Sequence, residues 1–176
     1  MYKLFPFIQI RNMETQTGFV IRLAVDAWLG QIKRVDKLLE ELGDEQLQKE
    51  IAPGKNSGVY LVGHLAAIHD AMLPLLMLGQ KIHPELEEIF IKNPDKSSMQ
   101  KPPTKLLRHY WKEVNDVLES HFLNMTVSDW LQKHTAVSEE DFAKQPHRNK
   151  LNVLLSRSNH LANHLGQMLL LKKNKD

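Results

Sequence analysis

Two histidines near the C-terminus, His160 and His164, stand four residues apart in the stretch SNHLANHLGQ. Because an α-helix completes one turn in about 3.6 residues, side chains at positions i and i+4 project from the same face. Two imidazoles in this arrangement can chelate a single metal ion, and histidine is the commonest metal ligand in proteins. The spacing therefore makes this helix face a candidate metal site.

A third histidine, His64, lies in the apolar stretch LVGHL at residues 61–65. Three neutral imidazoles without a fourth protein ligand would leave a coordination position open, as catalytic metal sites do. The alternative is that the pair consists of ordinary solvated or hydrogen-bonded side chains and that His64 is a satisfied core histidine. Spacing alone favours this second interpretation.

The chain has 176 residues and no cysteine. This length fits one domain, which we place at residues 1–176 with residues 1–14 as a possible N-terminal arm. The arm is apolar, and the pattern leaves two interpretations open: a strand-like arm, or an upstream extension with Met13 as an alternative start. The lack of cysteine removes thiolate ligands and a cysteine nucleophile, so histidine and carboxylate are the only strong metal ligands available.

Charge and hydropathy exclude several classes of partner. The formal net charge is only +2, and the one short basic run is the tail at residues 172–175, so we expect no nucleic-acid binding. No run of eighteen apolar residues exists, and the N-terminus lacks a small-residue cleavage site, so neither a membrane span nor a signal peptide is expected. These features agree with a cytoplasmic location.

Helical periodicity recurs in four long segments, at residues 15–42, 57–78, 104–123 and 150–171. Loops are predicted at residues 53–58, at 82–103 with a helical turn near 85–91, and at 126–149 with two short turns. Nothing alternates with a period of two over a useful length. The predicted fold class is all-α, a four-helix bundle with long crossover connections.

Details within these segments can be predicted too. In the first, the apolar positions recur at helical spacing: Phe19, Leu23, Ala27, Ile32, Val35 and Leu39. Ser57 is a candidate N-cap of the second helix, and Pro74 should interrupt its last turns because proline lacks a backbone N–H. Ser128 is a candidate cap of the short turn at residues 127–131.

The last segment carries apolar side chains on two opposite faces. One face has Leu151, Leu154, Leu155, Ala162, Leu165 and Leu169, and the other has Val153, Arg157, His160, His164 and Leu171. A helix packed against a single neighbour should be polar on its far side. We therefore expect burial on both faces, with a homodimer partner as the natural cover for the second, although a long loop would serve as well.

Taken together, the motifs resemble the DinB-like (YfiT-like) family of metal-binding four-helix bundles. The resemblance spans about residues 15–171 and is carried by the stretch from Gly63-His64-Leu65 to His69-Asp70, by His160-x-x-x-His164-Leu165-Gly166-Gln167, by residues 53–57 and by Asp129-Trp130. It implies that the metal ligands are His64, His160 and His164.

The resemblance also implies a chemistry. Some relatives are transferases that depend on bacillithiol, mycothiol or glutathione, and others are presumed metal-dependent hydrolases. Three imidazoles suit zinc, nickel, iron or manganese. Such an ion can lower the pKa of bound water, polarise an oxygen or bind a substrate thiol as the thiolate. We therefore expect a small electrophilic substrate and a low-molecular-weight thiol as partners.

Residues around the three histidines have further candidate roles. Gln167 could donate a hydrogen bond to a ligand, although a surface or packing glutamine is the equal alternative. Arg157, one turn before His160, could pair with an anionic substrate group, although a solvated arginine is the favoured alternative. Asp70 and Asp129 are candidate general bases only if folding brings them close. Among the remaining histidines, His69 lies within an apolar stripe and is read as a core histidine, and His83, before a proline, is read as a turn residue. The others are treated as background: His109, His121, His134 and His147. A non-catalytic metal-binding stress protein and a metal-free structural bundle remain as alternatives.

Overall fold

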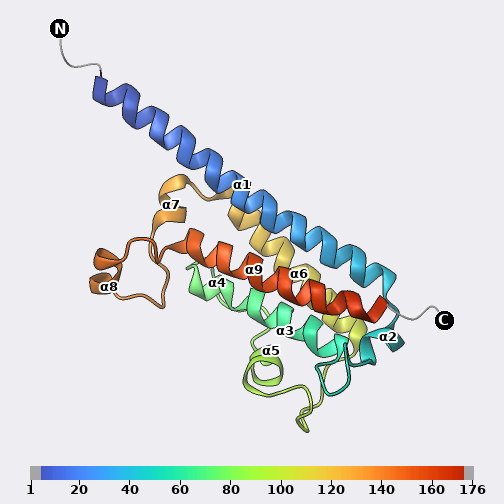
Figure 1. Cartoon of the computed structure of the whole chain (residues 1–176). Helices are drawn as coiled ribbons and strands as arrows, with labels where there is room; N and C mark the ends of the chain where they lie inside the picture. Colours follow the sequence, from blue (N-terminus) through green and yellow to red (C-terminus); the bar gives the residue numbers. More distant parts are fainter. Residues whose placement is uncertain (1–4, 173–176) are drawn as a thin grey trace.

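The computed structural model describes residues 5–172, with side chains from Thr15 onward. Four long helices dominate it: α1 (Phe5–Glu41), α3 (Gly58–Asp70), α6 (Thr104–Asn124) and α9 (Lys150–Met168). They lie side by side as a bundle (Figure 1). The described residues contain no β-strand, only two isolated bridges. The all-α fold class predicted from the sequence is confirmed.

Short elements fill the connections between the long helices. They are α2 (Asp44–Gln48), α4 (Met72–Leu75), α5 (Glu85–Glu87), the π-helical turn η1 (Glu88–Lys92), α7 (Val127–Leu131), α8 (Glu139–Lys144) and the 3-10 turn η2 (Leu169–Lys172). The helical turn expected near residues 85–91 is thus present. The cap expected for the turn near residue 128 is wrong by two positions, because Thr126 rather than Ser128 accepts the hydrogen bond from the Asp129 amide, at 3.2 Å.

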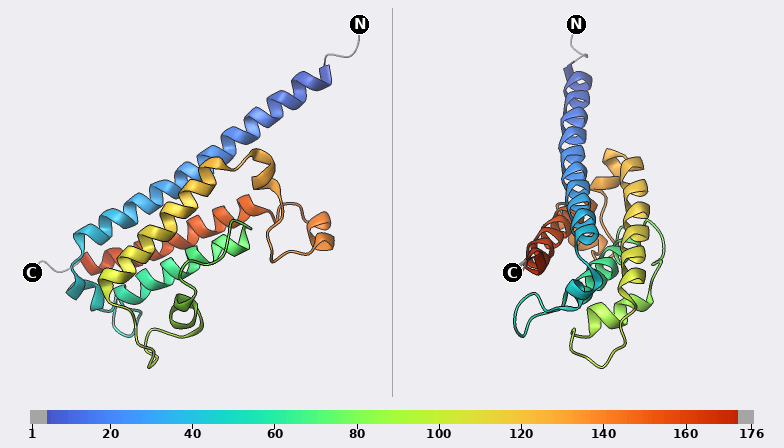
Figure 2. Two further views of the ribbon diagram at one scale, coloured as in Figure 1. Left: turned by 180° about the vertical axis from the view of Figure 1, so that it is seen from behind. Right: turned by 90° about the vertical axis from the view of Figure 1, so that its right-hand side faces the viewer.

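The long helices form a closed ring in which α1 packs on α9 and α6, and α3 packs on α6 and α9. The two further views in Figure 2 show the same arrangement, with the first turns of α1 extending beyond the bundle. The N-terminal arm expected from the sequence is therefore helical from Phe5 onward, and a strand-like arm is not observed there.

The buried stripe of α1 follows helical spacing through Ile21, Val25, Trp28, Ile32 and Val35. The predicted stripe was right from Ile32 onward and wrong before it, since Phe19 and Leu23 are 59% and 52% exposed. Apolar residues occupy more than one face of this part of α1. The sequence pattern alone therefore does not say which of these faces packs against the bundle.

Helix α3 begins as predicted, because the Ser57 hydroxyl accepts a hydrogen bond from the Tyr60 amide at 3.3 Å. It ends at Asp70, and the separate turn of α4 that contains Pro74 begins two residues later at Met72, so the predicted interruption is confirmed. The segment Gly58–Leu75 is apolar and long enough to cross a membrane by composition, but 72% of it is buried within the bundle. We interpret it as the core helix.

Candidate metal centre

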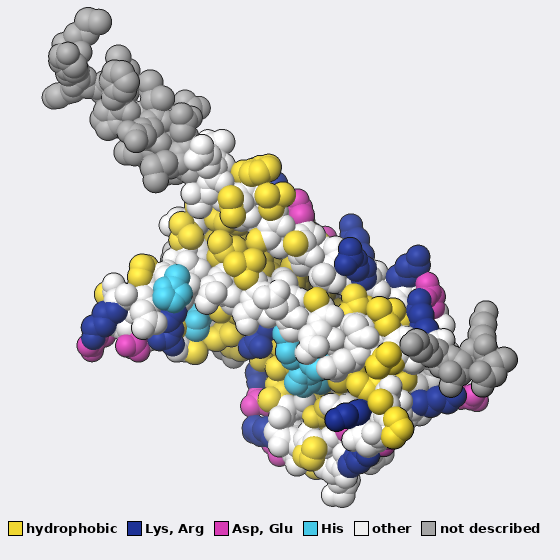
Figure 3. Space-filling model, in the orientation of Figure 1, with side chains coloured by type: hydrophobic (Ala, Val, Ile, Leu, Met, Phe, Trp, Pro, Cys, Tyr) yellow, Lys and Arg dark blue, Asp and Glu magenta, His cyan; other side chains and the backbone are white. Residues whose placement is uncertain are grey.

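The bundle brings the three predicted histidines together where α3 meets α9. The Nε2 atom of His160 lies 3.2 Å from Nε2 of His64 and 3.1 Å from Nε2 of His164. All three ligand atoms lie within 4.8 Å of one another. Histidine side chains gather near the middle of the face shown in Figure 3. His64 is 96 residues from His160 in sequence, so this contact is purely tertiary.

These distances suit one shared ion. Zinc–imidazole bonds of about 2.0–2.1 Å at tetrahedral angles place neighbouring nitrogens roughly 3.3 Å apart. The two measured separations fall close to that value. Each of the three side chains is partly exposed, so the side of the site away from the protein can admit water or a small ligand. The cluster could hold a metal ion with positions left open.

The backbone of η1 orients His64. Its Nδ1 donates a hydrogen bond to the carbonyl oxygen of Phe90 at 2.8 Å, which leaves the lone pair on Nε2 facing the other two histidines. The Tyr60 ring stacks on the imidazole at a centroid distance of 6.2 Å, and the Tyr60 hydroxyl donates to the carbonyl of Asn93 at 2.8 Å. Sequence reasoning missed Phe90, because a backbone acceptor in a loop leaves no side-chain signal.

Glycine at position 63 allows η1 to come this close to α3. A Cβ atom added at Gly63 would lie 2.3 Å from the Phe90 ring, far inside van der Waals contact. The Phe90 side chain is fully buried in this position. Any side chain at residue 63 would displace Phe90, and with it the carbonyl that holds His64.

The ligands on α9 are held differently. His164 donates from Nδ1 to the side-chain oxygen of Gln167 at 3.0 Å, so Gln167 contacts a ligand as expected but accepts the hydrogen bond instead of donating it. This bond fixes the tautomer in which Nε2 of His164 carries the lone pair. Nδ1 of His160 is buried and has no hydrogen-bond partner within the part of the chain that the structure describes.

Burial and mutual repulsion keep His64 and His160 neutral. Burial, followed by the neighbouring His164 and His64, lowers the pKa of His160 to about 4. Burial likewise lowers the pKa of His64, although its hydrogen bond to Phe90 opposes this. Both imidazoles are therefore uncharged at neutral pH, which is the form that binds a metal ion.

Arg157 lies one turn before His160 on the same helix, as expected from the sequence. Burial lowers the pKa of its guanidinium, and its Nε atom is buried without a hydrogen-bond partner. Within residues 15–172, no carboxylate forms an ion pair with it. The candidate site thus carries an uncompensated positive charge.

Neither carboxylate proposed as a general base is available at the site. Asp70 is buried, and its two oxygens accept the backbone amides of Ile82 and His83 at 2.7 and 3.0 Å. Asp129 instead caps α7, accepting from both the amide and the hydroxyl of Thr126. Both residues have structural roles, so these two candidates are not supported.

His69 lies five residues from His64 but belongs to the core. It is fully buried between Trp28 and Trp111, at ring-centroid distances of 5.7 and 5.1 Å. Its Nδ1 donates to the Asn115 side-chain oxygen at 2.7 Å. Burial lowers the pKa of His69 to about 4, so it is a neutral core histidine, as the sequence suggested.

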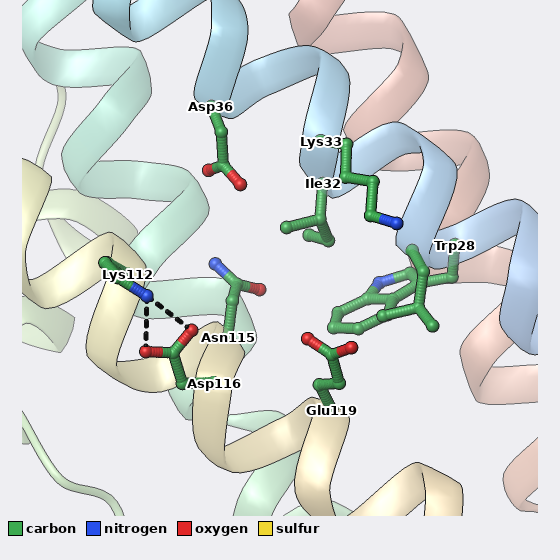
Figure 4. A pocket seen from close by; sticks show the side chains of 9 residues that line it. Trp28, Ile32, Lys33, Asp36, Lys112, Asn115, Asp116 and Glu119 are labelled. Carbon is green, nitrogen blue, oxygen red and sulfur yellow. Dashed lines mark hydrogen bonds and ion pairs between the residues drawn. The ribbon is translucent and has the colours of Figure 1, made fainter.

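A cavity of about 110 Å³ lies between α1 and α6 (Figure 4). Its walls include Trp28, Leu29, Ile32, Lys33, Asp36, Lys112, Asn115, Asp116 and Glu119, and none of the three clustered histidines. Lys112 and Asp116 pair across one turn of α6 at 2.7 Å. The cavity is therefore distinct from the histidine cluster, and its charges are mixed in sign.

Comparison with protein families now adds to this geometry. The DinB superfamily matches residues 27–168, which include both helices that carry the three histidines. The chain belongs to the DinB superfamily. A search of curated proteins finds no significant match to the chain. The family resemblance seen in the sequence is confirmed, and superfamily membership together with the three-histidine cluster fits a metal-binding protein.

We predict that His69 makes the stability of the metal-free protein depend on pH. The unfolded chain protonates this histidine near its ordinary pKa of about 6.5, and the folded chain only near 4. Between these values the unfolded state binds more protons, so the free energy of unfolding falls as the pH drops. Urea unfolding at about pH 7.5 and about pH 5 should show a loss roughly 2 kcal/mol larger in the wild type than in His69→Gln.

The exposed His109 supplies the control, since His109→Gln should leave this pH dependence unchanged. An equal loss in the wild type and in His69→Gln would contradict the assignment of the pH dependence to His69.

A second prediction concerns the glycine beside the ligand. Gly63→Ala should lower the free energy of unfolding by about 1–3 kcal/mol because the added methyl group would lie 2.3 Å from the buried Phe90 ring and force it to shift. It should also weaken metal binding, because the Phe90 carbonyl orients His64. Gly30→Ala is the matched control: its added methyl group meets nothing within 4 Å, so it should raise helix stability by about 0.5–1 kcal/mol. Metal titration and urea unfolding measure both effects, and a neutral Gly63→Ala would be the contrary result.

Proposed function

We propose that this protein is a metal-dependent enzyme that acts on small electrophilic molecules as a thiol-dependent S-transferase, with hydrolysis as the alternative reaction. The observation that supports it is the convergence of three Nε2 atoms on one point at a partly exposed surface. Three imidazoles satisfy only part of the coordination sphere of zinc, nickel, iron or manganese.

The protein's own residues hold and orient the ion. His64, His160 and His164 are the ligands, and the hydrogen bonds to Phe90 and Gln167 keep two of the rings in the metal-binding tautomer. When bound, a divalent ion would lower the pKa of a coordinated water or thiol and polarise a substrate oxygen.

The absence of a nearby carboxylate favours thiol transfer over hydrolysis. Within the described residues the cluster at the site contains histidines alone, and Asp70 and Asp129 are engaged elsewhere. Hydrolysis by a metal-bound water usually needs a general base as well. A coordinated thiol loses its proton to solvent on binding, so it needs no such residue. Because the chain has no cysteine, the thiol must come from a small molecule.

A second candidate is metal binding without turnover, as in a stress-response protein. The partial exposure of all three histidines favours it, because catalytic pockets usually enclose their substrate more completely. The two candidates share the metal site and differ in whether a small thiol binds the ion productively.

We further propose that the protein forms a homodimer through α9. The outward side of this helix exposes Leu155 (45%) together with Ala162, and Leu169 of η2, which follows α9 directly, is also 45% exposed. The sequence pattern predicted burial for the face that holds these three residues, and within one chain they are exposed instead. Light scattering at micromolar concentration should give twice the mass of one chain, and Leu155→Glu should halve it. Leu131→Glu, on α7, is the control, and a monomeric wild type would refute the dimer.

The metal site is tested by elemental analysis of the purified protein. We expect about one transition-metal ion per chain in the wild type and a loss of most of it in His64→Ala and in His160→Ala. His109→Ala, which removes an exposed histidine, should keep full occupancy. Full occupancy in either ligand variant would refute the assignment, and absence of metal from the wild type after reconstitution would leave a structural bundle.

A further inference from the structure

Arg157 shares its helix face with two of the metal ligands. It precedes His160 by three residues and His164 by seven, so the three side chains follow one another along the same side of α9. At a rise of about 1.5 Å per residue, the Arg157 backbone lies roughly one turn from His160. Burial is the main reason for the lowered pKa values of His64, His69 and His160, and the charge of Arg157 contributes to each.

The surroundings of Arg157 do not neutralise it. Its Nε is buried without a hydrogen-bond partner, and no described residue forms an ion pair with it. Arg108 shows the usual solution: its guanidinium donates to the carbonyls of Leu39 and Leu42 and pairs with Asp44 at 3.3 Å. A partly buried charge without such partners is costly, and proteins normally compensate it.

A divalent ion on the three histidines would place a second positive charge close to the first. Nothing charged negatively lies in the histidine cluster to balance either of them. The planar guanidinium matches a carboxylate through two parallel hydrogen bonds. A ligand that carries a carboxylate would supply the missing negative charge and the missing acceptors together.

We infer that Arg157 binds a carboxylate of the small molecule whose other end occupies the open side of the metal site. This inference rests on the proposed function, because it names the class of ligand for the same site. It assigns Arg157 as a specificity-determining residue: the preferred thiol or electrophile is a short anionic molecule, and neutral analogues bind less tightly.

The first experiment compares mercaptoacetate with its neutral isostere mercaptoacetamide on the cobalt-loaded protein. The sulfur-to-cobalt charge-transfer band reports binding of each thiol and requires no catalytic activity. The wild type should prefer mercaptoacetate, and Arg157→Gln should reduce that preference by about tenfold or more, since the hydrogen bonds involved are charge-assisted. Comparing the two proteins cancels any chelation of cobalt by the carboxylate itself.

Controls separate a binding role from a structural one. Arg157→Gln should bind mercaptoacetamide and cobalt as the wild type does, and Arg22→Gln, which removes an exposed arginine from α1, should keep the full preference. Arg157→Lys keeps the charge but not the two-pronged geometry, so it should retain an intermediate preference. If Arg157→Gln does not fold, the preference for mercaptoacetate over mercaptoacetamide is compared between the wild type and Arg157→Lys instead. An unchanged preference in the variant that is measured would overturn the inference.

A second experiment does not depend on metal. Sodium acetate should raise the thermal midpoint of the metal-free wild type above that in sodium chloride of equal ionic strength, and this difference should vanish in Arg157→Gln. If the wild type takes up no metal, the proposed function fails while this comparison still measures the anion site. An equal acetate effect in both proteins, or none in the wild type, would overturn the inference about Arg157.

Discussion

The approach of His64 to His160 across the α3–α9 packing is the constraint on which the rest of the site depends. Two nitrogen atoms stand 3.2 Å apart although 96 residues separate them in the chain. Two neutral imidazoles gain at most one hydrogen bond from such an arrangement, whereas a shared cation gains a bond to each. The surroundings hold the rings in place: Gly63 lets Phe90 approach α3, and the Phe90 carbonyl then turns His64 toward α9.

The site is polar but incomplete in hydrogen bonding and charge. His160 keeps a buried nitrogen without a partner, and Arg157 keeps a partly buried guanidinium that has a buried, unpartnered Nε and no counterion among the described residues. Buried polar groups of this kind are uncommon in proteins and concentrate where a ligand completes them. The same burial that leaves these groups unpaired also lowers the pKa of His160 and so prepares it to bind a metal ion.

His64 and His69 show how one helix gives identical side chains different roles. Five residues on an α-helix correspond to a rotation of about 140°, so the two imidazoles leave α3 in different directions. His64 faces α9 and remains partly exposed, whereas His69 is enclosed by two tryptophans and hydrogen-bonded to Asn115. Only the first can serve as a ligand to an ion reached from solvent.

Much of the fold was predictable because it depends on local chemistry. Helical periodicity located the four long helices, Ser57 marked the start of α3, and Pro74 marked its interruption. The exposed Phe19 and Leu23 show the limit of this reasoning. Periodicity identifies an apolar face, but when a helix has two, only the neighbouring helices decide which one is buried.

For the site, the sequence by itself determined one half: the i, i+4 spacing on a helix already places His160 and His164 side by side. The family motif pointed to His64, but only tertiary packing brings that ring to the pair. The packing also assigned Asp70 and Asp129 to structural hydrogen bonds and supplied the Phe90 carbonyl, which no side-chain pattern reveals. Spacing along one helix is a local property of the chain, whereas the meeting of two helices depends on every residue packed between and around them.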